Sequence, residues 1–537
     1  MPQKSRAPYH RTSTASPFTL KWPTCLKEIW PRAGFSGHTG GEGAGKTQPH
    51  SAYKTRELIR ESEDLSMHVI PQSWSHLHIL ISVFPPIGLL LVLGLYIAGL
   101  KRDNDFTRQT CLLLFAGLGL LSIPILVSGL LSMSALTGNT RFAPAAINTH
   151  LGWSIAALVA LLLTGVAAGL ELWRARRAHR PSGDPFHAIL GLAGVTLILT
   201  GIASELGIEI NHTELQLSVT IPDISTPQAW SHAHLILNHI PTAGFVFALV
   251  FFITALITDN DVMKRGSLIL FVICSIIGVP TYVAGTAAMW AITQPPIPGN
   301  EISLAVINSH RDMALWTLFG LAFTGGAAWI ELWRSRSIGH FSKRSLNLVL
   351  VFAVITLGIM TETGHRGGLI NHPEIRLAGD VLPTDPDVGI STGIEAVMKQ
   401  MIWFVPWQTV HFFGYCLIFG AVFAVVLRVL GFWKSVSFAA THRLLVLGFL
   451  GVIMNVVSGM LMMFGDSYRY VVSDTTFAPK VALIPLGAMA VLYFSASDRL
   501  WNVKAGENAP RTAKWVAAGA LLAWAGVLIC GRMLPYL

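Results

Sequence analysis

The sequence predicts an all-α integral membrane protein of about twelve transmembrane helices, arranged as three four-helix units of which the first two are an internal duplication. Hydrophobic residues make up 52% of the 537 positions and charged residues only 12%, whereas soluble domains contain roughly 25% charged residues. Apolar stretches long enough to cross a hydrocarbon layer as helices recur along the chain. In addition, several motifs that contain histidine occur twice.

The apolar stretches define the expected helices and units. Two units, 67–222 and 223–385, contain four stretches each, and a third four-helix module occupies 386–537. The expected membrane helices are 77–100, 110–134, 150–173, 188–209, 234–257, 267–291, 311–333, 346–362, 408–431, 443–465, 478–495 and 514–535.

The basic residues predict the topology. Lys and Arg gather in alternate loops, such as 174–180 and 334–344, and the positive-inside rule places these loops in the cytoplasm. The net charge of +9 is therefore a topology signal, and no nucleic-acid partner is expected. We expect a multi-pass protein of a bacterial inner (cytoplasmic) membrane, with the lipid bilayer as its surroundings.

Residues 1–66 are polar and basic and lack the apolar core of a signal peptide, so we expect a disordered extension. They contain Gly40-Gly-Glu-Gly-Ala-Gly-Lys-Thr47, which matches the phosphate-binding loop pattern. That loop binds phosphate only between a buried strand and a helix. No strand pattern precedes it and Pro49 interrupts any helix after it, so no nucleotide is expected. The topology places this basic segment on the extracytoplasmic side, where the positive-inside rule does not favour basic residues. A translation start at Met67 instead of Met1 is therefore an alternative.

Four motifs recur at a nearly constant offset, and three of them contain histidine. The offset is 156 residues from His76 to His232 and 160 residues from His150 to His310. The topology places every repeated histidine at an extracytoplasmic helix end. The motif pairs are Trp74-Ser-His76-Leu-His78 with Trp230-Ser-His232-Ala-His234, Asn148-Thr-His150 with Asn308-Ser-His310, Glu171-Leu-Trp-Arg174 with Glu331-Leu-Trp-Arg334, and Asn211-His212-Thr-Glu214 with Asn371-His372-Pro-Glu374.

The repeated histidines indicate a cofactor at the outer end of each bundle, a common place for such sites. Residues two apart on a helix point about 200° apart, so one histidine of each His-x-His faces the bundle. Two imidazoles from different helices suit axial ligation of haem b, and three suit copper or zinc. The expected cofactor ligands are His78, His150 and His212 in the first unit, His234, His310 and His372 in the second, and His411 in the third.

Other polar residues are secondary candidates. Glu205 and Glu362 share the motif Gly-Ile-x-x-Glu near the outer end of the fourth helix of each unit, where a carboxylate can orient an imidazole or carry a proton. His239, His365 with Arg366, and Asp312 have no counterparts in the first unit, so if only one unit is active, the second is the better candidate. Glu171 and Glu331 are expected to form interfacial salt bridges. The secondary metal candidates are His76, His232, His239 and His365.

The third module differs from the first two. From about Trp403 the repeat is lost, although four apolar stretches follow. Ser458-Gly-Met460-Leu-Met462-Met463 contains thioethers of the kind that bind copper(I), but methionines on an apolar helix are more typical of packing. The five cysteines form no Cys-x-x-Cys, so neither covalent c-type haem nor a disulfide framework is expected.

Two family resemblances follow from these residues. Each repeat resembles a bacterial membrane family of unknown function, marked by His-Pro-x-x-x-His-Phe-Pro and Gly-Gly-x-x-x-x-His. His234-Leu-Ile-Leu-Asn-His239-Ile-Pro241 and Gly367-Gly-Leu-Ile-Asn-His372 are similar to these motifs, whereas Val83 replaces the second histidine in the first repeat. Residues 403–537 distantly resemble copper-resistance-D-like proteins through His411-Phe-Phe-Gly, Leu427-Arg-Val-Leu-Gly431 and Gly531-Arg-Met. The resemblance implies haem-linked electron transfer or copper handling.

The expected function is that of a membrane-bound, cytochrome b-like electron-transfer subunit with non-covalent haem at its outer face. Its expected partners are a periplasmic c-type cytochrome, quinone or other subunits of a redox complex, and it would then be the membrane subunit of an oxidoreductase. A copper-handling or transport protein is the alternative, based on His-x-His and the methionines. A structural membrane subunit with ordinary interfacial histidines is a third possibility.

Overall fold

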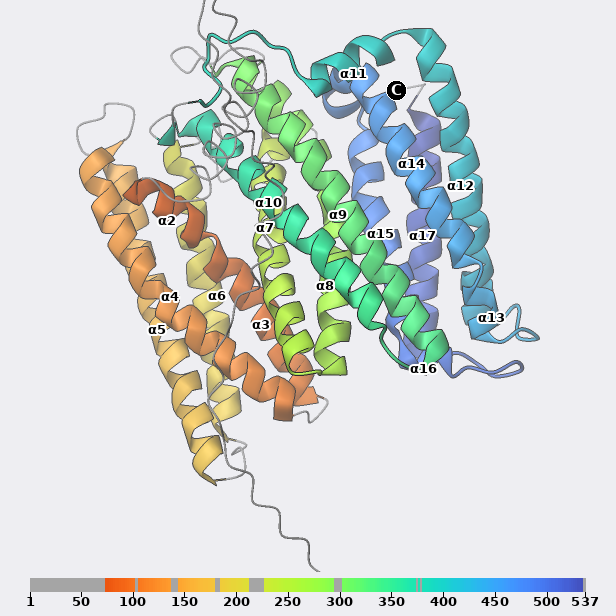
Figure 1. Cartoon of the computed structure of the whole chain (residues 1–537), viewed down its shortest axis with the longest axis horizontal. Coiled ribbons are helices and arrows are strands. Elements are labelled where there is room, and N and C mark those ends of the chain that lie inside the picture. The colour runs from red at the N-terminus through yellow and green to blue at the C-terminus, as the bar shows by residue number, and fades with distance from the viewer. Residues whose placement is uncertain are drawn as a thin grey trace, which may run out of the picture. The chain divides into compact units, whose positions relative to one another are not determined.

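The computed structural model describes residues 73–534 except for short gaps at 102–104, 137–142, 179–183, 212–226, 294–301, 373–374 and 377–378. The predicted extension 1–66 lies outside the described residues. Within the described part, twelve helices are long and apolar enough to cross a membrane, which confirms the predicted fold class. The long helices run side by side in alternating directions (Figure 1).

The first eight spans are built from nine helices. The first span is divided at Val83, because two consecutive prolines, Pro85 and Pro86, are tolerated in the first turn of a helix but not in its interior. The helices are α2 (Trp74–Ser82), α3 (Phe84–Lys101), α4 (Asp105–Leu136), α5 (Pro144–Ala178), α6 (Asp184–Asn211), α7 (Pro227–Ile257), α8 (Asp261–Thr293), α9 (Leu304–Ile338) and α10 (Lys343–Asn371).

The remaining four spans lie in the third module. A short helix that the apolar pattern did not predict, α11, precedes them. The elements are α11 (Ile390–Met398), α12 (Met401–Leu430), α13 (Phe438–His442), α14 (Leu445–Gly465), the π-helical turn η3 (Arg469–Ser473), α15 (Phe477–Ala496), α16 (Asp498–Trp501) and α17 (Arg511–Met533).

One predicted boundary was wrong by more than two turns. The eighth helix was expected to end at residue 362, but α10 continues to Asn371. The sequence after Glu362 is polar, and a hydropathy pattern ends there. In the structure this polarity is neutralised locally, since Arg366 pairs with Glu362 and His365 with Asp380. The helix therefore carries these residues without breaking.

Small and hydroxylated residues hold the helices together at matching positions. Gly119 of α4 and Gly165 of α5 touch through their backbones, which is typical of close helix packing in membranes. The hydroxyls of Thr164 and Thr196 lie 2.9 Å apart between α5 and α6. Thr324 and Thr356 make the same contact at 3.0 Å between α9 and α10, 160 residues later.

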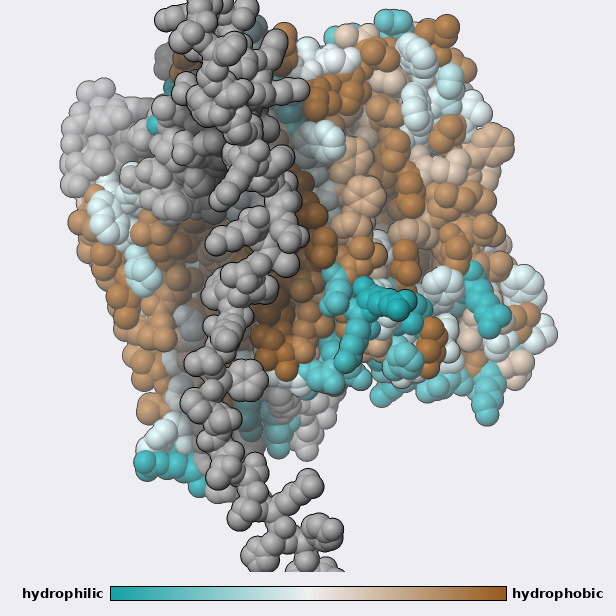
Figure 2. All heavy atoms as spheres, in the orientation of Figure 1, coloured by the Kyte–Doolittle hydropathy of each residue, from teal (hydrophilic) through white to brown (hydrophobic). Residues whose placement is uncertain are grey.

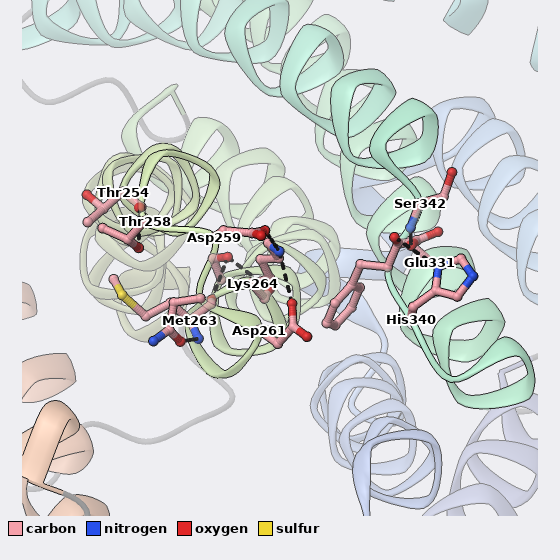
Figure 3. Close-up of polar contacts among 12 residues, drawn as sticks. Thr254, Thr258, Asp259, Asp261, Met263, Lys264, Glu331, His340 and Ser342 are labelled. Atoms are coloured by element: carbon pink, nitrogen blue, oxygen red, sulfur yellow. Dashed lines mark hydrogen bonds and ion pairs between the residues drawn. The ribbon is translucent and has the colours of Figure 1, made fainter. Parts of the chain in front are cut away.

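Hydrophobic side chains cover the middle of the visible helix faces, with hydrophilic residues toward the helix ends (Figure 2). At the α9–α10 turn, the predicted salt bridge of Glu331 is confirmed: its buried carboxylate accepts hydrogen bonds from Arg334 and from the backbone amide of Ser342. Nearby, Lys264 lies between Asp259 and Asp261 in the α7–α8 turn (Figure 3). These ion pairs stabilise the α7–α8 and α9–α10 turns of the second unit.

Candidate functional site

The two histidines of the second unit that face its interior are held in the same way. The Nδ1–H of His234 on α7 donates to the carbonyl of Thr281 on α8 at 3.0 Å, and the ring lies against Gly285. The Nδ1–H of His310 on α9 donates to the carbonyl of Thr363 on α10 at 3.0 Å, and its ring lies against Gly367. We call this arrangement an imidazole seat: a ring on a glycine, with Nδ1 bonded to the carbonyl four residues earlier.

The first unit contains the same two seats. His78 donates to the carbonyl of Ile125 at 3.1 Å and lies against Gly129. His150 donates to the carbonyl of Ala203 at 3.0 Å and lies against Gly207. The spacing from histidine to glycine is 51 residues for the first seat and 57 for the second in both units.

Glycine is required at these positions because the ring occupies the space of a side chain. A Cβ on Gly285 or Gly367 would lie 2.8 Å from the Cε1 of its imidazole, well inside the van der Waals contact distance. The carbonyl also determines the tautomer, because an oxygen that only accepts requires a proton on Nδ1. In the neutral ring the lone pair is then on Nε2, the nitrogen that ligates metals when Nδ1 is oriented in this way.

The two seats of each unit bring their imidazoles together. The ring centres of His234 and His310 lie 6.4 Å apart, with their planes 74° from each other. In the first unit, His78 and His150 occupy the matching positions on the first and third spans. Each pair therefore joins the first and third membrane spans of a unit through its histidines, and each histidine is bonded to the next helix.

The separation distinguishes between two kinds of two-histidine ligation. Metal–nitrogen bonds of about 2.0 Å and about 1.1 Å from nitrogen to ring centre place two opposite imidazoles about 6 Å apart and two tetrahedral ones about 5 Å apart. The observed separation of 6.4 Å is nearer the first of these two values. Two neutral imidazoles from different helices are donors of the kind that would hold a b-type haem.

The other histidine of each His-x-His contacts the opposite unit. His76 lies 5.6 Å, ring to ring, from His365 on α10, and the Nε2 of His365 is 3.1 Å from the carboxylate of Asp380. In the reverse direction, the Nε2 of His232 lies 3.1 Å from Glu205 on α6. Helix geometry predicted this division of roles, and the structure adds that the outward-facing histidines link the two units.

The two glutamates of the shared Gly-Ile-x-x-Glu motif have different partners. Glu205 contacts His232, whereas Glu362 pairs with Arg366 at 2.6 Å. Arg366 also donates to Ser309 at 2.9 Å. Beside it, Ser309, Arg366 and Asp380 line a cavity of about 40 Å³, which is room for water but not for an organic ligand.

Asp312 has a structural role that was not expected. Its carboxylate accepts from the backbone amides of Ile390 and Ser391 at 2.9 and 2.8 Å, where α11 begins. The neighbouring Arg311 pairs with Glu395 of the same helix at 2.6 Å. Asp312 therefore docks α11, and that the second unit is the active one stays a prediction.

The remaining predicted residues are not members of these two pairs. His212 lies outside the described residues. His372 is the C-cap of α10, five residues beyond Gly367. His239 bonds to the carbonyl of Leu235 in its own helix, and His411 lies in the third module against Gly459. Met460 and Met463 are buried in an apolar cluster, as packing residues are.

Among the described residues, no group of three or more His, Cys, Asp or Glu side chains is arranged to hold a metal ion. The sequence reasoning identified the paired histidines but missed the glycines that seat them. The signal was available, because Gly129 and Gly285 share one offset with His78 and His234.

Comparison with protein families matches residues 231–372 to a family described as predicted membrane proteins (DUF2231). The matched segment contains His234, His310 and both of their glycines. Comparison with curated proteins gave no match. Comparison with solved structures gave none either.

Proposed function

We propose that this multi-pass membrane protein is a cytochrome b-like electron-transfer subunit that holds one non-covalent haem between the two imidazoles of each of its first two units. His78 and His150 would hold the first haem and His234 and His310 the second. The observation that carries the proposal is the imidazole seat, which occurs four times, each time with a glycine under the ring and with Nδ1 bonded to the carbonyl four residues before that glycine.

Packing alone does not account for this arrangement. A histidine that only pairs with the free backbone groups at a helix end needs one hydrogen bond and no second imidazole beside it. Here four rings are oriented by carbonyls on neighbouring helices, as ligating histidines typically are, and the rings of His234 and His310 lie 6.4 Å apart. The recurrence at offsets of 156 and 160 residues supports descent of both units from one duplicated ancestor.

Bound haem would supply reversible one-electron chemistry. The chain's residues would orient the ligands and exclude water. The Nδ1–H donors bonded to carbonyls make the imidazoles more basic ligands, and the apolar helices around them favour the less charged form of the site. We further propose a bacterial inner membrane as the location, and a c-type cytochrome or another redox subunit as the electron acceptor.

The test is a reduced-minus-oxidised visible spectrum of the full-length protein purified in detergent, with haem and copper determined on the same sample. We expect two haems per chain and a b-type spectrum. His234→Ala and His310→Ala should each remove one haem and leave the other. His187→Ala, on an exposed residue of α6, is the matched control and should retain both.

Other results have clear meanings. Stoichiometric copper without haem would support the copper-handling alternative. Absence of both haem and copper from a well-folded protein would refute the proposed sites. So would haem that is still bound by the quadruple variant, in which His78, His150, His234 and His310 are all replaced by Ala.

A further inference from the structure

The third module has a strongly basic surface at the end where α12 finishes and α17 begins. Residues 431–444 and 497–514 contain six lysines and arginines but only two carboxylates, Asp498 and Glu507. Five of the six basic side chains are exposed and one is half-buried. Figure 2 shows hydrophilic residues gathered at this end, over α13 and α16. The six are Lys434, Arg443, Arg499, Lys504, Arg511 and Lys514.

The two segments that carry these residues lie against each other. The amide of Gly506 donates to the carbonyl of Lys434 at 2.7 Å, and the amide of Phe438 donates to the carbonyl of Val503 at 3.1 Å. The ring of Trp501 packs on that of His442, with 4.5 Å between their centres. The basic residues of both segments therefore belong to one surface, which we call the basic loop surface.

Arg428, at the end of α12, holds the backbone of this surface in place. Its fully buried guanidinium donates to the carbonyls of Val436, Lys504 and Glu507, the last two at 2.8 and 3.2 Å. One rigid fork of donors thus joins three backbone positions in the two segments. Because the backbone is already ordered, a ligand of the basic loop surface does not have to order it on binding.

The carboxylates near this surface leave its positive charge largely uncompensated. Asp498 pairs with Arg265 of α8 and Arg336 of α9, and Glu507 accepts from the backbone amide of Lys504 at 2.9 Å. Within the described part of the chain, no carboxylate forms an ion pair with any of the six basic side chains. The surface is therefore complementary to an anion.

Exposed aromatic side chains adjoin the basic residues. Phe432 and Trp433 directly precede Lys434, and Trp515 directly follows Lys514. Phe432 is 80% exposed and Trp515 79%. Aromatic and basic side chains together at helix ends are typical of the boundary between hydrocarbon and water. A ligand with a negative headgroup and hydrocarbon chains uses both kinds of side chain, whereas a free phosphate uses only the basic ones.

We propose that the basic loop surface binds the headgroups of anionic phospholipids in the adjacent leaflet of the membrane. Phosphate oxygens accept from the lysines and arginines, and the acyl chains pack beside Phe432 and Trp515. Basic residues next to a membrane span attract anionic lipids in this way. This inference does not depend on the proposed function, because no haem takes part in it.

The test uses the full-length protein in non-ionic detergent micelles and two lipid probes, phosphatidylglycerol and phosphatidylcholine, with the same chains and the same fluorescent label on one chain. Binding is measured by fluorescence anisotropy. We expect phosphatidylglycerol to bind at least about tenfold more tightly, because each Lys or Arg near an anionic surface contributes about fivefold in affinity. Salt screens exposed charges, so the difference should shrink between about 0.05 and about 0.5 M salt.

Variants locate the surface. Lys434→Gln combined with Arg499→Gln, one change in each segment, should weaken phosphatidylglycerol binding by about tenfold or more and leave phosphatidylcholine unaffected. Lys101→Gln combined with Arg174→Gln is the matched control, because it removes the same two charges from exposed positions of the first unit. This control should bind like the unmodified chain. Thermal unfolding checks that each variant is folded.

Three results would overturn the proposal. The first is equal affinity for the two lipids, and the second is unchanged phosphatidylglycerol binding in the Lys434→Gln and Arg499→Gln variant. The third is an equal loss in the control, which would mean that net charge and not this surface binds the lipid. Displacement of the labelled lipid by glycerol 3-phosphate as readily as by unlabelled phosphatidylglycerol would show a phosphate site in place of a lipid site.

Discussion

At the scale of single residues, the glycine of each seat determines whether an imidazole can face its partner. The ring of His234 fills the space above Gly285, and its bond to the carbonyl of Thr281 depends on that close approach. A methyl group there displaces the ring, and the ring cannot tilt away without losing the bond. Seat glycines therefore matter as much as the ligands themselves.

The corresponding prediction concerns Gly285→Ala. Overpacking of a well-packed contact costs about 1–3 kcal/mol, so we expect a lower unfolding temperature and loss of one haem of the expected two. Gly266→Ala on the same helix is the control, because a Cβ there meets nothing within 4 Å. A Gly285→Ala protein with full haem content and unchanged stability would show that the seat does not position His234.

The paired histidines could be identified from the sequence because their motifs repeat, and a repeat can be recognised without knowledge of the contacts that its residues make. The seats could not be identified in the same way. Which carbonyl accepts from Nδ1 depends on how far one helix is shifted along the other. Hydropathy cannot give this shift, because it locates helix ends only to within several residues.

At the scale of secondary structure elements, α11 shows how the second unit differs from the first. Arg311 is buried, and pairs with Glu395 while it also lies over the ring of Phe464, 4.6 Å from its centre. Asp312 accepts the first amides of the same helix, where a negative charge is favoured. Two adjacent residues of α9 thus hold one short helix from both ends.

This docking predicts an asymmetry between single and double variants. Arg311→Met leaves the carboxylate of Glu395 without its partner and should destabilise the protein by about 3–5 kcal/mol. Arg311→Met combined with Glu395→Met removes both charges and should recover most of that loss. The measurement is thermal or denaturant unfolding in detergent. A double variant no more stable than the single one would indicate that Arg311 acts through Phe464 and not through the ion pair.

The element boundaries show the same limit of sequence reasoning. Helix number and approximate position followed from hydropathy, and twelve spans are confirmed. The end of α10 and the presence of α11 did not follow, because both depend on charges that are neutralised only by partners distant in sequence, such as Asp380 for His365.

At the scale of the whole molecule, the two units contact each other reciprocally. His76 of the first unit meets His365 of the second, and His232 of the second meets Glu205 of the first. The first spans of both units also touch, with the rings of Phe84 and Phe247 6.1 Å apart. The two contacts are equivalent in position, as expected where a duplicated unit packs against its own copy.

The topology is tested by cysteine labelling. Val388, before α11 and α12, is 83% exposed, and Phe432, after α12, is 80% exposed. Because the span of α12 separates them, we expect a membrane-impermeant maleimide to label Val388→Cys from outside intact cells. Phe432→Cys should react only after the cells are opened. Labelling of both positions in intact cells would contradict the predicted orientation.

The seats also bear on how the protein is made. Each histidine is bonded to the next membrane-spanning helix: His234 ties α7 to α8, and His310 ties α9 to α10. Each of these helical hairpins therefore contains its own half of a site, oriented by a hydrogen bond within the hairpin. A metal or haem bound by both histidines would connect two hairpins that have already formed. Cofactor binding would then be the last step of assembly, and only complete chains would retain the cofactor.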